Sequence, residues 1–358
     1  MESSPIRALV ADDSRVARQL MARILESDER VRVIGSVEDG QAALEFVQDQ
    51  RPDVVIMDIH MPRLDGFEAT RRIMETQPVP IVICSASLDP RQVATTFKVL
   101  EAGAVACVEK PVAKGHDSYE ALASNFLQTV KLMSEVKVIR RWPRTRTASN
   151  FEPTPPSRPV APGIQFIGIG ASTGGPPVLQ TILGALPKDF PIPVLIVQHI
   201  AKGFLPGLAE WLNQTTGWKI QIAAYGETPQ AGHAYLAPDD FHLSLSASGR
   251  LLLSREDPVG GLRPAVAYLF RSLAQNFGSQ AIGVLLTGMG RDGAEDLKLM
   301  RDSGAETIAQ DRETSVVHGM PGEAIALGGA SYILPAEKIA DTLVTLIKRR
   351  SASDKFAP

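Results

Sequence analysis

Short apolar runs alternate with amphipathic segments along most of this sequence, and this alternation constrains the fold more than any other feature. In the first third, the runs stand at residues 6–11, 31–37, 53–58, 80–86 and 104–110. Strands that are apolar along their whole length are buried on both faces, as in a parallel sheet covered by helices. These strand–helix units, spread over roughly 130 residues, predict one doubly wound α/β domain with a five-stranded parallel sheet.

The alternation stops at residues 140–163 and then resumes. This segment holds six prolines and five arginines and has almost no aliphatic periodicity. Because it cannot bury enough apolar surface to fold, we interpret it as a linker. The sequence therefore predicts a first domain at 1–135, an Arg/Pro-rich linker at 136–163 and a second domain at 164–350.

The second domain is predicted to be α/β as well. Its strand-like and helical segments are, in chain order, 164–170, 176–186, 193–198, 263–277, 281–288 and 292–303. Residues 233–254 alternate apolar and polar side chains around an Ala-Ser-Gly turn, which is typical of an antiparallel hairpin. We expect a mostly parallel sheet with a β-hairpin insertion.

Composition excludes several classes of protein. The formal net charge is −3 and no basic recognition helix follows the linker, so a nucleic-acid partner is not expected. Two cysteines, Cys84 and Cys107, exclude a disulfide scaffold and a cysteine-based zinc site. Strand-like residues begin at Ile6 without a preceding signal, and no apolar run is long enough to cross a bilayer. We therefore expect a cytoplasmic protein without membrane insertion.

Polar side chains stand at the ends of the strands predicted in the first domain. Asp12 and Asp13 follow the first strand, and Asp58 closes the third. The carboxyl ends of parallel strands meet at one edge of the sheet, where three carboxylates repel one another unless a hard cation such as Mg2+ lies between them. Ser85 ends the fourth strand and Lys110 follows the fifth. Together these groups predict a phosphoryl acceptor site.

Each of these residues alone has a plainer interpretation, since Asp12, Asp13 and Ser14 precede a helix and are typical caps. Their combination resembles a known family. The strings ADDSRVAR, MDIHMPRLDG, CSAS and EKP are similar to the motifs of two-component receiver domains, over about residues 5–130. The resemblance implies that a histidine kinase phosphorylates Asp58.

The same resemblance implies a role for each residue of the acidic edge. Asp12, Asp13 and Asp58 are expected to bind Mg2+, which phosphorylation requires. Ser85 is expected to be the switch hydroxyl, and Lys110 the lysine that binds phosphate.

The second domain opens on a glycine-rich string, IGIGASTGGPP. A dinucleotide fingerprint starting at Gly168 fails, because Thr173 stands at its third glycine. A P-loop starting at Gly170 fails, because Pro176 stands where lysine is required. The pattern G-x-S-x-G remains, and it places Ser172 on a sharp strand-to-helix turn where backbone N–H groups bind an oxyanion. A phosphate-binding loop at a helix N-terminus stays open as an alternative.

A nucleophilic serine needs a base and an orienting carboxylate. His199 directly follows the strand VLIVQ, so it reaches the same sheet edge as Ser172. Asp292 follows the strand AIGVLLTG, although a helix cap or an Asp-Gly turn is an alternative for it. Three strand ends that supply serine, histidine and aspartate predict a catalytic triad. The other histidines are less suitable by position: His60 lies in the first domain, His116 follows its last strand and His233 sits in a Gly-containing turn. His242 and His318 are loop or hairpin candidates, which are more often surface or packing residues.

The second domain also resembles a known family. The strings GASTGGP, VQHI, LLTGMGRDGA and HGMPGEA are similar to the motifs of the chemotaxis protein-glutamate methylesterases, the CheB family. With the receiver and linker, this resemblance covers nearly the whole chain in the right order. It implies Ser172 as nucleophile, His199 as general base and acid, and Asp292 as the group that orients His199. The segments of Thr173 and Met289 are implied to supply the oxyanion N–H groups.

The expected function is that of a phosphorylation-regulated serine hydrolase. The resemblance implies a chemotaxis histidine kinase as phosphodonor and methyl-accepting chemoreceptors as substrates. Ser172 is expected to hydrolyse glutamyl methyl esters without a cofactor, and deamidation of glutamine is expected as a second activity. A response regulator whose second domain binds a protein or an anion, without catalysis, stays open as the alternative.

Overall fold

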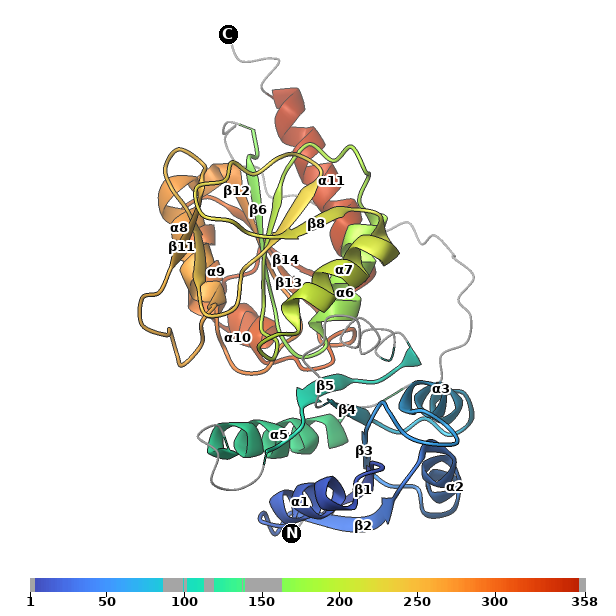
Figure 1. The fold of residues 1–358 in the computed structure, drawn as a ribbon. Helices are drawn as coiled ribbons and strands as arrows, with labels where there is room; N and C mark the ends of the chain where they lie inside the picture. The colour runs from blue at the N-terminus through green and yellow to red at the C-terminus, as the bar shows by residue number, and fades with distance from the viewer. Residues whose placement is uncertain are drawn as a thin grey trace. The chain divides into compact units, whose positions relative to one another are not determined.

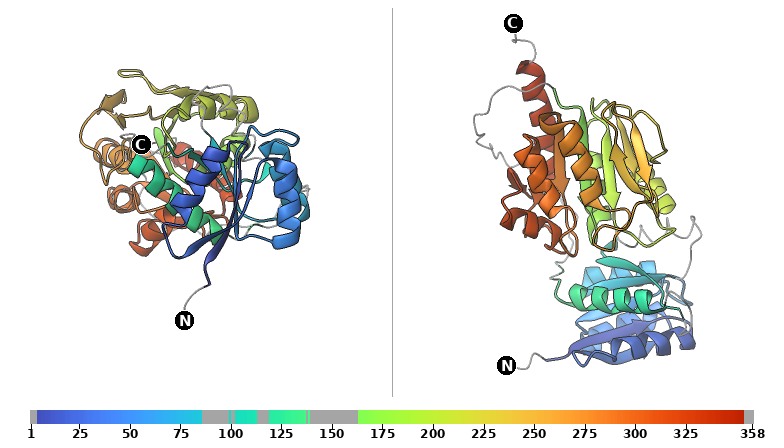
Figure 2. Two further views of the ribbon diagram at one scale, coloured as in Figure 1. Left: turned by 60° about the horizontal axis from the view of Figure 1, so that its bottom comes forward. Right: turned by 90° about the vertical axis from the view of Figure 1, so that its left-hand side faces the viewer.

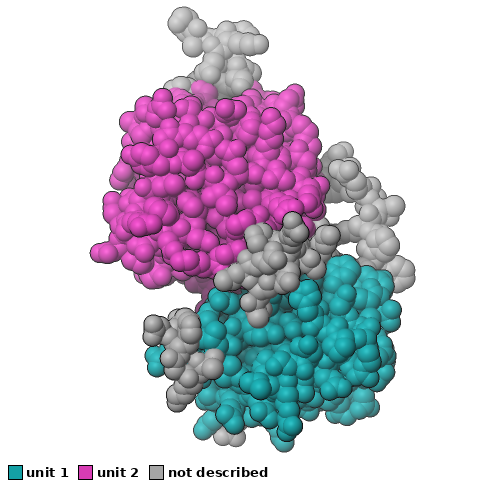
Figure 3. Space-filling view, viewed as in Figure 1, with its two compact units in different colours: residues 1–147 teal, residues 148–358 magenta. Residues whose placement is uncertain are grey.

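The computed structural model describes residues 4–85, 99, 102–112, 119–136, 138 and 163–353 of the 358-residue chain. The chain divides into two compact units, residues 1–147 and 148–358, which are coloured separately in Figure 3. The predicted linker falls almost entirely on residues outside the described ranges. Its boundaries therefore stay a prediction.

The first unit is a five-stranded parallel sheet in the order β2-β1-β3-β4-β5. Its strands are β1 (Ile6–Ala11), β2 (Val31–Val37), β3 (Val54–Met57), β4 (Ile81–Ser85) and β5 (Ala106–Glu109). Its described helices are α1 (Arg15–Leu25), α2 (Gly40–Gln50), α3 (Gly66–Thr76) and α5 (Tyr119–Ser134). All residues of β3 and β4 are buried, as expected for central strands covered on both faces.

The helices of this unit begin where the sequence offers a capping side chain. Ser14 accepts a hydrogen bond from the Ala17 N–H at the start of α1. Asp39 and Asp65 do the same for α2 and α3. Each cap pairs an N–H group that the first helical turn leaves free. Ser14 and Asp39 lie within three residues of the ends of β1 and β2, so the chain turns sharply at the carboxyl edge of the sheet there, whereas a longer loop separates β3 from Asp65.

The second unit is built on a seven-stranded sheet in the order β14-β13-β12-β6-β7-β9-β8, with all neighbouring pairs parallel. Its strands are β6 (Phe166–Ala171), β7 (Val194–Gln198), β8 (Lys219–Ile222), β9 (His233–Leu236), β12 (Ala281–Leu285), β13 (Glu306–Gln310) and β14 (Tyr332–Leu334). A separate antiparallel hairpin pairs β10 (His242–Leu245) with β11 (Leu251–Ser254). The predicted α/β class, parallel sheet and hairpin are confirmed.

The hairpin is shorter than predicted. Residues 233–236 form β9, which pairs in parallel with β7 and β8 instead of joining the hairpin. The alternating pattern of this region predicts strands but does not identify the partner of each strand, so it does not distinguish a parallel neighbour from an antiparallel one. Tertiary pairing decided that β9 extends the large sheet.

Helices cover both faces of the seven-stranded sheet (Figures 1 and 2). They are α6 (Gly175–Ala185), α7 (Leu205–Thr216), α8 (Val266–Asn276), α9 (Ala294–Asp302), α10 (Met320–Ala326) and α11 (Ala336–Ser353), with a 3-10 turn at Gly278–Gln280. Helix α6 packs on α7 and α11, while α8 packs on α9 and α9 on α10. None of the helices in the described ranges is both long and apolar enough to cross a membrane.

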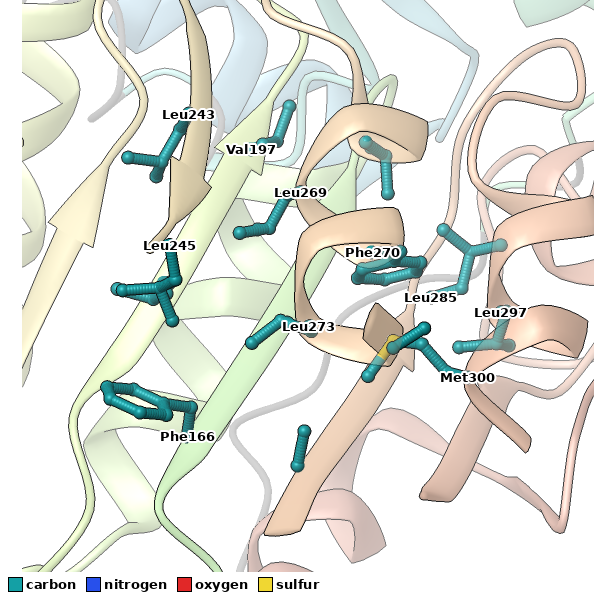
Figure 4. Packing of buried hydrophobic residues seen from close by; sticks show 14 of the residues in the cluster. Phe166, Val197, Leu243, Leu245, Leu269, Phe270, Leu273, Leu285, Leu297 and Met300 are labelled. Atoms are coloured by element: carbon teal, nitrogen blue, oxygen red, sulfur yellow. The ribbon is translucent and has the colours of Figure 1, made fainter. Parts of the chain in front are cut away.

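Helix α8 links the hairpin to the large sheet. It contacts β10 on one side and β6 and α9 on the other. Figure 4 shows its apolar residues between those of the hairpin and those of β12 and α9, in a cluster that includes Leu243, Leu245, Leu269, Phe270, Leu273, Leu285, Leu297 and Met300. This packing fixes the N-terminus of α8, which is part of the site described below.

Candidate active site and acidic cluster

Three neighbouring strands at the centre of the large sheet position the predicted triad. Strands β12, β6 and β7 are adjacent, and Asp292, Ser172 and His199 follow them at their carboxyl ends. Backbone hydrogen bonds continue past the strand ends: Ser172 N–H donates to Thr287 O at 3.0 Å, and His199 N–H donates to Ala171 O at 2.9 Å. The structure thus brings the three residues to one edge, as the sequence predicted.

The turn at Ser172 is sharp, and glycine permits it. Gly175 N–H donates to the carbonyl of Ser172 at 2.8 Å, which closes the turn before α6. Gly174 has φ +79°, a left-handed conformation that favours glycine, and a Cβ there would lie 2.5 Å from Cβ of Val316. The turn leaves Ser172 half-buried at the start of the helix.

The structure pairs His199 with Asp292. Nε2 of His199 lies 2.9 Å from Oδ2 of Asp292, although the ring N–H direction is not aligned with that oxygen. In the described part of the chain, no hydrogen bond joins the Ser172 hydroxyl to the imidazole. The hydrogen bond between Ser172 and the ring that completes the Ser–His–Asp line must therefore form later, as catalytic hydrogen bonds often do when substrate binds.

Asp292 has further partners at the N-terminus of α8. Its Oδ2 accepts from Val266 N–H at 2.6 Å and its Oδ1 from Ala267 N–H at 3.1 Å. Burial alone would raise the pKa of Asp292, but the His199 ring and the two backbone N–H groups lower it below its usual value. Asp292 is thus held as a carboxylate beside the imidazole. It does cap a helix, but that helix is α8 rather than α9, whose N-cap is Gly293.

The segments of Thr173 and Met289 meet through one buried threonine. The hydroxyl of Thr287 donates to Thr173 O at 2.9 Å and accepts from Val317 N–H at 2.9 Å. Its N–H donates to Oε1 of Gln310 at 2.8 Å. Met289, two residues beyond Thr287, is 38% exposed, so its side chain is in contact with solvent.

His318 lies near the Ser172 turn, because it forms a β-bridge with Gly288, where a Cβ would lie 2.8 Å from Cβ of Ser172. In the described part of the chain, His60, His233 and His242 have no hydrogen bond with the triad residues. His242 is fully buried: its Nδ1 accepts from Ala265 N–H at 3.3 Å, its Nε2 lies 3.2 Å from Asp257 O, and its ring stacks on Tyr268 at 4.5 Å. It is a packing residue, as the sequence suggested. Nδ1 of His233 lies 3.0 Å from Ala231 O, and Nδ1 of His318 lies 3.3 Å from Oγ of Ser315. His116 lies outside the described residues.

Two glutamines behind the site were not predicted. Gln198 and Gln310 are the last residues of β7 and β13, and both are buried. Their side chains bind backbone of the loops that carry Ser172 and Thr287. A signal for them exists in the sequence, because each is a lone amide that ends an apolar strand, in PVLIVQ and in ETIAQ.

The acidic cluster of the first unit is also assembled at a sheet edge. Carboxylate oxygens of Asp12, Asp13 and Asp58 lie within 4.8 Å of one another. Nζ of Lys110 lies 2.7 Å from Oδ2 of Asp12 and 3.1 Å from Oδ2 of Asp58. Ser85, at the end of β4, is buried, and its carbonyl accepts from the Lys110 N–H at 2.9 Å. All five predicted residues are therefore neighbours.

The charges of this cluster are unbalanced. Burial raises the pKa of Asp58; Lys110 opposes that rise and the charge of Asp12 adds to it. Burial would lower the pKa of Lys110, but Asp12 and Asp58 outweigh it, so the net shift is upward. One ammonium against three carboxylates leaves excess negative charge among oxygen donors, which fits a hard divalent cation.

Comparisons with known proteins match each unit of the chain to a family. Residues 8–117 match the family model of the response regulator receiver domain, and residues 167–343 match that of the CheB methylesterase.

Two curated relatives extend the similarity along the chain. A protein-glutamate methylesterase/protein-glutamine glutaminase of Nitrosospira multiformis is 49% identical, covering 96% of this chain and 98% of the relative. One of Geobacter metallireducens is 51% identical, covering 95% and 99%.

A solved structure resembles the second unit. The crystal structure of the Thermotoga maritima CheB methylesterase catalytic domain aligns with a TM-score of 0.50 and 41% identity, covering 51% of this chain and 98% of that domain. With near-complete relatives at about half identity, the chain belongs to the CheB family of protein-glutamate methylesterases/protein-glutamine glutaminases that carry a receiver domain.

Proposed function

We propose that this chain hydrolyses γ-methyl esters of glutamate side chains on methyl-accepting chemoreceptors, with Ser172 as nucleophile. The observation that carries the proposal is the pairing of His199 with Asp292 at the strand edge where the turn presents Ser172. Membership of the family supports the reaction class, and the activities named for the relatives support the ester and the amide as substrates.

The reaction follows from the positions of these groups. His199 takes the proton of the Ser172 hydroxyl while Oγ attacks the ester carbonyl carbon. The resulting oxyanion accepts hydrogen bonds from the N–H groups of Thr173 and Met289. His199 then protonates the leaving methoxide, and methanol departs. Water, deprotonated by His199, attacks the acyl-enzyme and releases glutamate and Ser172. A glutamine side chain passes through the same steps and releases ammonia.

Asp292 stabilises the imidazolium that forms in both steps. Its carboxylate is held by two N–H groups of α8, so it does not need to reorganise when His199 becomes charged. The esterase steps use only groups of the chain itself and require no cofactor.

We propose that the first unit receives a phosphoryl group on Asp58 from a chemotaxis histidine kinase. Asp12, Asp13 and Asp58 would hold Mg2+, which neutralises the charge of the incoming phosphoryl oxygens. Lys110, which pairs with Asp58, would bind a phosphoryl oxygen once it exchanges this partner, and Ser85, the last residue of β4, would bind another. We infer that this modification raises the esterase rate of the second unit.

The decisive experiment measures methanol released from methylated receptors. Ser172→Ala is expected to lower the rate by about 10³-fold or more, because the attacking atom is lost. Ser248→Ala, at the exposed hairpin turn, serves as the matched control and should behave as the parent. Retained methanol release in Ser172→Ala would contradict the triad and favour a non-enzymatic output domain.

A further inference from the structure

The last residue of β7 is a buried glutamine that stands between the nucleophile and the base. Gln198 is only 4% exposed. Its Nε2 donates to the carbonyl of Ser172 at 2.9 Å and to the carbonyl of His199 at 2.8 Å. One amide group therefore ties together the backbone of the two residues that exchange the proton.

The orientation of this amide is determined by its partners. If it were reversed, Oε1 would face two carbonyl oxygens and repel both, so only the nitrogen fits there. Oε1 itself is buried and has no hydrogen-bond partner in the described part of the chain. A Cβ at Gly175 would lie 2.2 Å from Oε1, so glycine at 175 is what allows the amide this close to the turn.

The contact with Ser172 O acts on the next residue. A peptide group is planar and trans, so its C=O and N–H point in opposite directions. The carbonyl of Ser172 and the N–H of Thr173 belong to one such group. Gln198 and the N–H of Gly175, at 2.8 Å, hold its carbonyl, and Thr287 holds the carbonyl of Thr173 on the following peptide. The direction of the Thr173 N–H is thereby fixed.

We propose that Gln198 is a positioning residue for the oxyanion site. It aims the Thr173 N–H at the developing oxyanion, and by donating to the same peptide it makes that N–H a stronger donor, as in other hydrogen-bond chains. By donating to the His199 carbonyl, it also fixes the backbone position from which the imidazole side chain extends. This inference rests on the proposed function, since it assigns Gln198 a part in the reaction of Ser172.

The test replaces Gln198 by methionine, which has a similar volume but no donor. We expect kcat for methanol release to fall by about 10- to 100-fold while KM changes by less than about twofold, because the lost hydrogen bond acts mainly in the transition state. Binding of an alkyl boronic acid, which forms a tetrahedral adduct with an active serine, should weaken by a similar factor.

Asn213 offers a matched control. Its Nδ2 also donates to two carbonyls, those of Ala209 at 2.9 Å and Ile220 at 2.7 Å, but it ties α7 to the edge strand β8. Asn213→Leu should lower thermal stability and leave kcat and boronate affinity unchanged. If Gln198→Met loses no more kcat than this control, the proposal is wrong.

A second variant tests the donor itself. In Gln198→Glu, an ionised carboxylate would repel both carbonyls, whereas the protonated acid donates one hydrogen bond. The ratio of variant to parent kcat should therefore rise as pH falls from about 8 to about 6, and a flat ratio would overturn the proposal. Ser172→Ala, measured alongside, separates the two failures: if it is active, the proposed function fails, and if only the Gln198 variants match the parent, the present inference fails.

Discussion

At the scale of single residues, Asp292 shows how one side chain connects stability to chemistry. Its carboxylate faces His199 and accepts two N–H groups from the first turn of α8. Burial disfavours the charge, but these partners outweigh it and lower the pKa of Asp292. Ionisation of Asp292 is therefore more favourable in the folded protein than in the unfolded chain. This carboxylate stabilises the fold at neutral pH and loses that effect in acid.

We predict that Asp292→Asn lowers kcat for methanol release by about 10²- to 10⁴-fold, because His199 loses its orienting charge. The variant should also be less stable than the parent above about pH 5. That stability difference should shrink as pH falls below about 4 toward the lowered pKa of the folded protein, because Asp292 itself then becomes neutral.

Urea unfolding followed by tryptophan fluorescence measures this difference, since Trp211 and Trp218 are buried in the second unit. A difference in unfolding free energy that is independent of pH down to about pH 2 would contradict the lowered pKa of Asp292.

At the scale of secondary-structure elements, the turn that precedes α6 depends on the left-handed backbone conformation of Gly174. Gly174 lies in the left-handed region and against Val316, whereas Gly184 near the end of the same helix has no atom within 4 Å of the position its Cβ would take. Gly174 thus occupies a turn that requires glycine, whereas Gly184 occupies a helix position that has room for a larger side chain. The pair allows a controlled substitution within one element.

We predict that Gly174→Ala lowers the free energy of unfolding by about 1–3 kcal/mol and methanol release by more than about tenfold, because the Ser172 turn must shift. Gly184→Ala should instead raise stability by about 0.5–1 kcal/mol at unchanged kcat. Thermal melts and methanol assays of both variants provide the measurements. Parental activity in Gly174→Ala would show that the left-handed turn does not place the nucleophile.

At the scale of the whole molecule, the two units carry separate chemistry in one chain. The acidic cluster consists of three carboxylates and Lys110, whereas the proposed triad consists of Ser172, His199 and Asp292. A phosphodonor and a chelator should therefore affect the two activities differently. This separation provides a test of regulation that uses the full chain.

With Mg2+ and a small acyl phosphate, we predict a single phosphoryl group on Asp58 and a rise in methanol release of about 5- to 150-fold, the range of ordinary allosteric coupling. EDTA should prevent phosphorylation and leave the basal rate unchanged. Asp58→Asn should keep the basal rate and lose the response. Asp53→Asn is the matched control, because its carboxylate binds Arg7 N–H at the opposite end of β3. An Asp58→Asn protein that is still phosphorylated and stimulated would refute the assignment.

Local sequence was sufficient for the five strands of the first unit and for β6, β7 and β12, but β8, β13 and β14 were not predicted. Apolar runs fixed the identity of β1, β3, β6 and β7, because a fully buried strand leaves few polar positions. The chemistry-bearing residues follow at strand ends, where parallel topology gathers them, so Ser172 and His199 could be named in advance. The start of the hairpin could not, because alternation does not distinguish a parallel neighbour from an antiparallel one.

What the sequence by itself determined is the class of each domain and the predicted acidic and triad residues at the carboxyl edges, because hydrophobic period and strand-end position are local properties. What only the tertiary structure decided is which hydrogen-bond donors and acceptors hold the site residues in place. Asp292 caps α8 rather than its own helix, and Gln198 donates to both Ser172 and His199. These partners lie on different elements, and no local pattern encodes the packing that brings one buried N–H group to one particular oxygen.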